Sequence, residues 1–181
     1  LNLFASPRVR QAVTMCVDSQ AILDKVLMGM STVPDSYLPP DHWLYHPDLP
    51  TYEYDPEAAL EQLAAVGWVD YDQDASTPLT AVGVAGVPND TAFSFTYLVP
   101  EDSERQKVAQ IVKESLAQCG IQAEIESQPW GTLLGPGPDS PVFGRAFDMA
   151  QFAWGKLSRS PCFLYQSDEV PGPYPDYPKG W

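Results

Sequence analysis

The amino-acid sequence predicts an α/β fold: a mixed sheet that contains a parallel β-α-β (βαβ) unit and is flanked by helices. Residues 93–99 and 121–127 alternate apolar and polar side chains, which is the period of a half-buried strand. Residues 103–119, between them, repeat apolar side chains at helical spacing. A strand, a helix and a strand over about 35 residues form a crossover that is almost always parallel and right-handed. The 181 residues, 44% of them hydrophobic, suffice for one domain with a substantial core.

Two helices are expected at the start of the chain. Ser6 suits the N-cap of the first and Pro7 its first helical position. The buried face of this helix is expected at Val9, Val13 and Cys16. A second helix follows directly, and its buried stripe is expected at Ile22, Leu23, Val26 and Leu27.

The caps of the second and third helices are also indicated. Asp18 or Ser19 caps the second helix, and Gly29 ends it. Asp55 and Pro56 open the third as N-cap and first helical residue. Its inward side chains are expected at Leu60, Leu63 and Ala64, and its end at Gly67.

Residues 30–56 form a segment of 27 residues with six prolines and no regular period. A structureless loop of this length is uncommon in a compact domain. Aromatic side chains are frequent in it, so we expect the segment to pack down over a surface. These are Tyr37, Trp43, Tyr45, Tyr52 and Tyr54.

The sheet part begins with a strand whose apolar face is Phe93, Phe95, Tyr97 and Val99. Ser103 and Gln106 have the spacing of a capping box for the helix that follows, and Gly120 ends that helix. The helix is expected to bury Val108, Ile111, Val112 and Leu116, and the second strand Ile121, Ala123 and Ile125. Residues 147–155 are apolar on both faces apart from Asp148 and Gln151, which predicts a central strand.

The charge excludes two classes of partner. With 24 acidic and 10 basic residues the chain has a net charge of −14, whereas binding to nucleic acid or to an anionic membrane needs clusters of Lys and Arg. No apolar run approaches the roughly 20 residues of a membrane-spanning helix.

No cofactor or metal is expected. Asp70, Asp72 and Asp74 have the spacing that opens a calcium loop, but Ala75 and Ala81 replace the required Gly and Glu, which favours a solvated turn. His42 and His46 are four residues apart in a segment that is not helical, and no third ligand accompanies them.

Two tryptophans suggest a binding site. Trp130 follows the strand at 121–127, and Trp154 ends the strand at 147–155. Ligands of open α/β folds bind beyond the carboxyl ends of the strands, and large aromatic side chains there suit the capture of small molecules. The alternative is that both are ordinary core residues. The absence of a phosphate-binding glycine loop and of an activated nucleophile favours a binding protein over an enzyme.

The order of these motifs resembles the family 5 extracellular solute-binding proteins, the receptors for peptides, nickel and other solutes that serve ABC importers. The motifs are "FASPRVRQAVTMCVDSQAILDKVL", "PDSYLPP", "YEYDPEAALEQLAAVGW", the β-α-β unit and "FDMAQFAWG". The resemblance implies that residues 1–181 are a single lobe of a longer, two-lobed periplasmic-binding-protein-like receptor, its second lobe or domain III. Its parts would be a helical part with the Pro-rich loop (1–69), the sheet part (78–160) and a tail that leads back to the missing lobe (161–181).

The resemblance also implies residue roles. Trp130 and Trp154 match tryptophans that line the ligand cleft of peptide-binding members, and Gly155, Gln151 and Lys156 are the candidate ligand-binding residues around them. Those members carry an acidic residue, which pairs with the amino terminus of the peptide, at the position of Leu157. A solute with an anionic or neutral end is therefore an alternative to a peptide.

We therefore expect a non-catalytic lobe that captures a small solute, a peptide or another, by hinge closure. Its partners would be the solute, the missing first lobe and the ABC permease subunits. The protein would be extracytoplasmic, held at a membrane only through a lipoprotein anchor outside these residues. The alternatives are a small hydrolase that pairs Asp148 with an acidic loop residue, or an interaction module that has lost ligand binding.

The three cysteines lie in different settings. Cys16 and Cys119 lie on apolar helix faces and are expected to be buried free thiols. Cys162 follows Pro161 in a segment without a period. Because the family is extracytoplasmic, we expect Cys162 to bond, in the full receptor, to a cysteine beyond Trp181. The denatured chain would then contain three free thiols.

Overall fold

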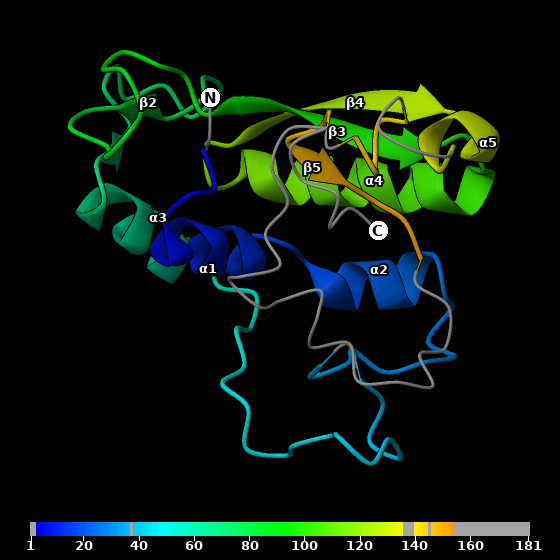
Figure 1. Cartoon of the computed structure of the whole chain (residues 1–181). Coiled ribbons are helices and arrows are strands. Elements are labelled where there is room, and N and C mark those ends of the chain that lie inside the picture. Colours follow the sequence, from blue (N-terminus) through cyan, green and yellow to red (C-terminus); the bar gives the residue numbers. More distant parts are fainter. Residues whose placement is uncertain (1–2, 37, 136–139, 145, 154–181) are drawn as a thin grey trace.

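The computed structural model describes residues 3–36, 38–135, 140–144 and 146–153. Its main sheet has the strand order β4-β3-β5, in which β3 (Ser94–Pro100) runs parallel to β4 (Gln122–Gln128) and to β5 (Met149–Ala150). Helix α4 (Ser103–Ala117) connects β3 to β4 and packs against both. Figure 1 shows the sheet lying over α4, with the N-terminal helices beneath. The predicted parallel β-α-β unit is confirmed.

The central strand is β3, which corrects the prediction for residues 147–155. Within the described residues β5 is one of the two outer strands of the sheet, and it pairs only two residues with β3, Met149 with Tyr97 and Ala150 with Leu98. Leu98 is buried on one face of β3 and Tyr97 on the other. It is therefore β3 that buries apolar side chains on both of its faces, and β3 has a neighbouring strand on each side.

Three helices precede the sheet: α1 (Pro7–Met15), α2 (Ser19–Lys25) and α3 (Pro56–Ala65). Asp18 and Asp55 cap α2 and α3, and each carboxylate accepts the backbone N–H three residues on. Ser6 occupies the N-cap position of α1 without a side-chain capping bond. Among the described residues, no helix is both long enough and apolar enough to cross a bilayer.

Two of the expected buried faces are wrong in part. Helix α2 has no buried residue, and Leu27 is 42% exposed, because only Ile22 of the expected stripe packs against the main core. In α3, Ala64 is exposed, and Ala59 is buried beside Leu63 instead.

The main core fills the space between the sheet and the helices. The predicted face of β3 and its preceding residue is buried, from Phe93 to Val99. The ring of Phe93 stacks on that of Trp68 at a centroid distance of 4.2 Å. Trp68 lies on β1 (Trp68–Val69), which forms a small antiparallel sheet with β2 (Thr80–Ala81) that the sequence pattern does not predict.

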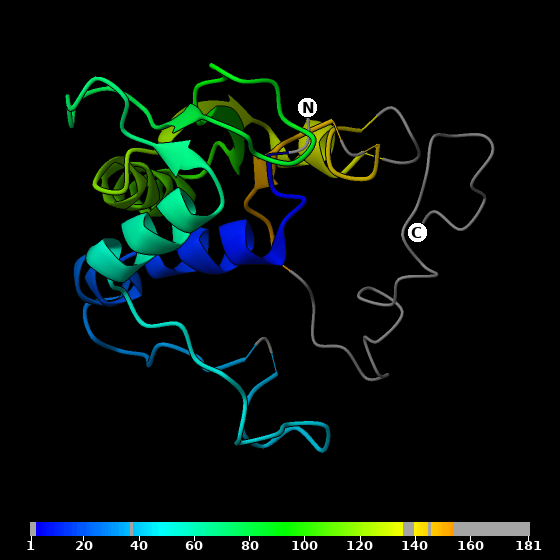
Figure 2. The same cartoon turned by 90° about the vertical axis from the view of Figure 1, so that its left-hand side faces the viewer.

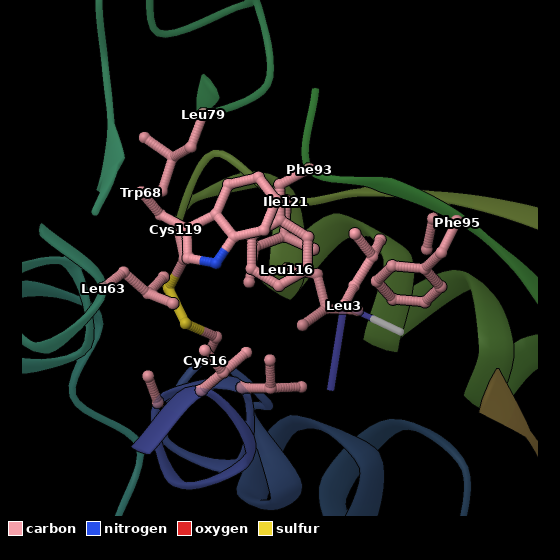
Figure 3. Packing of buried hydrophobic residues seen from close by; sticks show 14 of the residues in the cluster. Leu3, Cys16, Leu63, Trp68, Leu79, Phe93, Phe95, Leu116, Cys119 and Ile121 are labelled. Atoms are coloured by element: carbon pink, nitrogen blue, oxygen red, sulfur yellow. A yellow bond between two sulfur atoms is a disulfide. The ribbon is translucent and has the colours of Figure 1, made fainter. Parts of the chain in front are cut away.

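A disulfide joins Cys16 to Cys119, which corrects the expectation of buried free thiols. Cys16 ends α1 and Cys119 follows α4, and their Cα atoms are 6.1 Å apart in the middle of the core. Figure 3 shows the bond near Leu63 and Trp68. The expectation of three free thiols is therefore wrong. Cys162 lies outside the described residues, and its pairing stays a prediction.

The Pro-rich segment extends away from the helices (Figures 1 and 2). The expectation that its aromatic side chains pack down is wrong for Trp43, which is 75% exposed. The end of the segment is nevertheless hydrogen-bonded to α1 and to the C-cap of α4. Tyr52 accepts a hydrogen bond from Gln11 at 2.8 Å, and Tyr54 donates one to Gln118 at 2.9 Å.

We predict that the disulfide is a major source of stability. Replacing both Cys16 and Cys119 by Ala should lower the free energy of unfolding by about 2–5 kcal/mol, because the bridge closes a long loop in the unfolded chain. Urea unfolding without reductant measures the loss, with Cys162→Ser as the control that keeps the bridge. The denatured, unreduced wild-type chain should titrate as one free thiol, and a titre of three would contradict the bridge.

Candidate functional site

The carboxyl ends of the three parallel strands meet at one edge of the sheet. Pro100, at the end of β3, pairs with Gln128, at the end of β4. Two further backbone bonds continue the edge: Glu101 N–H donates to the Gln128 carbonyl at 3.1 Å, and Gln151 N–H donates to the Leu98 carbonyl at 2.9 Å. Ligands of open α/β folds bind at such an edge. Here we call it the carboxyl edge: Pro100–Asp102, Gln128–Trp130 and Gln151.

Trp130 stands at the carboxyl edge on a short helix, α5 (Trp130–Leu133), beside the ends of β3 and β4 (Figure 1). The helix is held by Leu133, which is buried against Leu98 and Val142 on the face of the sheet away from α4. Trp130 itself is 37% exposed. It is therefore not an ordinary core tryptophan, and its indole is accessible at the surface.

Asp102 is the residue of this edge that sequence reasoning misses. The N-cap of α4 is Asp102, not Ser103, and its Oδ1 accepts the backbone N–H of Arg105 at 2.9 Å. Its Oδ2 accepts the indole N–H of Trp130 at 3.2 Å. The predicted capping box is wrong because Ser103 is not the N-cap, and the side-chain amide of Gln106 donates instead to the Pro100 carbonyl and the Ser127 hydroxyl. A carboxylate directly before Ser103 is the available signal, since Asp is at least as good an N-cap as Ser.

Gln106 ties the ends of β3 and β4 together. Its side-chain amide donates to the Pro100 carbonyl at 2.6 Å and to the hydroxyl of Ser127 at 2.9 Å. The turn that carries Asp102 is thereby held between the two strands.

Gln151 lies at the same edge, half-buried, after β5. Its side-chain oxygen accepts the hydroxyl of Tyr97 at 3.3 Å. Tyr97 is only 3% exposed, and burial raises the pKa of its hydroxyl to about 12. A neutral hydroxyl therefore orients the Gln151 amide.

The other predicted site residues, Trp154, Gly155 and Lys156, lie outside the described residues. The structure thus places Trp130 and Gln151 on one edge. That Trp130 and Trp154 both line a ligand cleft stays a prediction.

The acidic turn is built by its own hydrogen bonds. Asp72 accepts the backbone N–H of Asp74 at 3.1 Å and the hydroxyl of Thr77 at 3.0 Å, and these bonds hold the pKa of Asp72 below its ordinary value. The exposed turn is the arrangement expected from the sequence. Within the described residues no group of three His, Cys, Asp or Glu side chains could hold a metal ion.

The histidines and Asp148 also make local contacts. The Nδ1 atoms of His42 and His46 accept the backbone N–H groups of Leu44 and Asp48, both at 3.2 Å. Asp148 accepts the backbone N–H of Thr96, at 3.1 Å, from the neighbouring strand β3. This contact explains the position of Asp148 without a hydrolytic role.

We predict a pH-dependent loss of stability from Tyr97. The pKa in the fold is raised above the ordinary value of 10.0, so the contribution of Tyr97 is complete below pH 10 and is lost as pH rises towards about 12. Tyrosinate absorption during an alkaline titration should lose a component near pH 12 in Tyr97→Phe. Tyr71→Phe, which removes a tyrosine that is 81% exposed, is the control. Loss of a component near pH 10 in Tyr97→Phe would contradict the burial argument.

Comparison with known proteins agrees with this architecture. Residues 2–170 match the model of the bacterial extracellular solute-binding proteins, family 5 (middle region). The oligopeptide-binding protein AppA of Bacillus subtilis strain 168 is 31% identical over 138 residues, which are 74% of this chain and 23% of AppA. The dipeptide-binding protein of Escherichia coli K12 is 30% identical over 127 residues, 70% of this chain and 21% of that protein.

A solved structure shows the same relationship in three dimensions. The structure of Bacillus subtilis AppA in complex with a nonapeptide superposes with a TM-score of 0.71 and 28% identity, over 89% of this chain and 30% of that one. The chain therefore spans about a fifth to a third of the length of these relatives. Because the family match extends over nearly all of its residues, the chain belongs to the family 5 extracellular solute-binding proteins.

Proposed function

We propose that this chain is the solute-binding lobe of an extracytoplasmic receptor for an ABC importer. The observation that carries the proposal is the placement of Trp130 at the carboxyl edge, where it is 37% exposed and hydrogen-bonded to Asp102. An amphipathic aromatic ring that is accessible and already oriented suits the wall of a binding cleft. Gln151 adds an amide oriented by Tyr97 at the same edge.

The solute is a peptide or another small molecule. The names of the two curated relatives, an oligopeptide-binding and a dipeptide-binding protein, support a peptide. Leu157 stands where the family resemblance implies an acidic partner for the peptide's amino terminus, and Lys156 precedes it. A cationic residue without that acidic partner suits a solute with an anionic or neutral end.

Capture takes place by hinge closure of two lobes, of which this chain supplies one. The solute is then buried between the lobes and delivered to the permease subunits of the importer. The receptor acts outside the cytoplasm, with a lipoprotein anchor in another part of the full-length protein. The binding site consists of Trp130 and Gln151 together with Trp154, Gly155 and Lys156.

We predict that the full-length receptor binds solute and that this chain alone binds it weakly. A defined pool of di- to pentapeptides is titrated calorimetrically into both proteins. Because half of the cleft is absent, the isolated chain should bind with a Kd no tighter than about 1 mM, against about 1 μM for the receptor. In the receptor, Trp130→Ala should weaken binding at least about tenfold, since it removes an aromatic anchor.

Trp43→Ala is the matched control, because Trp43 is 75% exposed on the Pro-rich segment, and it should leave the affinity unchanged. Micromolar binding by the isolated chain, or equal affinities of the Trp130→Ala and wild-type receptors, would refute a shared cleft at the carboxyl edge.

A further inference from the structure

The carboxylate of Asp102 makes two hydrogen bonds that serve different parts of the fold. Oδ1 accepts the backbone N–H of Arg105 at 2.9 Å and so caps α4. Oδ2 accepts the indole N–H of Trp130 at 3.2 Å, across 28 residues of sequence. One side chain therefore links the start of α4 to the accessible tryptophan beyond β4.

We propose that Asp102 is a positioning residue that holds the indole of Trp130 in its binding orientation before solute arrives. The inference rests on the proposed function, in which Trp130 forms part of the cleft wall. An exposed tryptophan would otherwise distribute over several rotamers and would lose that freedom on binding. The indole N–H is the only hydrogen-bond donor of the tryptophan side chain, and its bond to a carboxylate fixes the edge of the ring. The two faces of the ring are left for other contacts.

The carboxylate can act as a fixed point because it is itself held. Its first oxygen is bound at the N-terminus of a 15-residue helix, where backbone N–H groups favour negative charge. The turn that bears it is fastened on both sides: Glu101 N–H bonds to Gln128, and the Gln106 side chain bonds to Pro100. The register of β3 and β4 thus fixes the relative position of Asp102 and Trp130.

Different contacts hold the backbone and the indole of Trp130. Trp130 is 37% exposed, and its indole N–H donates to Asp102 Oδ2. The short helix is anchored through Leu133, three residues away and fully buried. The backbone of α5 is therefore fixed by core packing, whereas the direction of the indole is fixed by Asp102.

Substitution of Asp102 by Asn separates its two roles. Asn is as good an N-cap as Asp, so the cap of α4 is kept. The amide NH₂ that replaces Oδ2 is a donor and cannot accept the indole N–H. Asp102→Ser likewise keeps a capping oxygen and removes the second acceptor. Asp55→Asn is the matched control, because Asp55 caps α3 through Ala58 N–H at 3.0 Å, far from this edge in the sequence.

The test measures the indole N–H of Trp130 by ¹H–¹⁵N NMR on the full chain, with the resonance assigned by its absence in Trp130→Phe. In Asp102→Asn and Asp102→Ser we expect the resonance to shift and its heteronuclear NOE to fall, while circular dichroism stays unchanged. Asp55→Asn should leave the resonance in place. An unchanged resonance and NOE in both Asp102 variants would overturn the proposal, whatever the receptor binds.

A second measurement connects the orientation to binding. In the full-length receptor, Asp102→Asn should weaken binding of the peptide pool about 2- to 10-fold, the effect of having to order one side chain on binding. Suppose that Trp130→Ala weakens binding, whereas Asp102→Asn shifts the indole resonance but leaves the affinity unchanged. That result would overturn the positioning role and leave the proposed function intact. If Trp130→Ala has no effect on affinity, both the positioning role and the site in the proposed function are overturned.

Discussion

The parallel pairing of β3 with β4 is the interaction on which the rest of the structure depends. Seven consecutive residues of each strand are in register, from Ser94 with Gln122 to Pro100 with Gln128. This register brings the two carboxyl ends to the same level, so that the turn after Pro100 lies beside the start of α5. The contact between Asp102 and Trp130 follows from it, because both residues lie two positions beyond the last paired residues, Pro100 and Gln128.

The two faces of β3 pack against different groups of residues. The face with Phe95 and Tyr97 belongs to the main core beneath the sheet, where the Cys16–Cys119 disulfide fastens the first helix to the end of α4. The other face carries Leu98, which packs with Leu133 and so fixes α5 at the carboxyl edge. The main core and the disulfide thus lie on one side of the sheet, whereas α5, which carries Trp130, packs on the other.

Features encoded within short segments could be predicted from the sequence. The alternation at 93–99 and 121–127 gives both strands, and Asp55 with Pro56 marks the start of α3. Features that depend on contacts between distant segments could not. The disulfide joins residues 103 apart in sequence, and the indole contact of Asp102 requires the register of two strands. For the same reason the sequence indicates the edge at which Trp130 lies but not the residue that orients it.

Hydrogen–deuterium exchange on the full-length receptor tests most directly whether the carboxyl edge of this lobe forms the binding cleft. The receptor is compared as purified with its bound solute and after unfolding, dialysis and refolding without solute. We expect slower exchange with solute in residues 100–106 and 128–134, because lobe closure buries that edge, and unchanged exchange in residues 30–50. Equal exchange of the edge segments in the two states, with protection confined to other parts of this lobe, would contradict it.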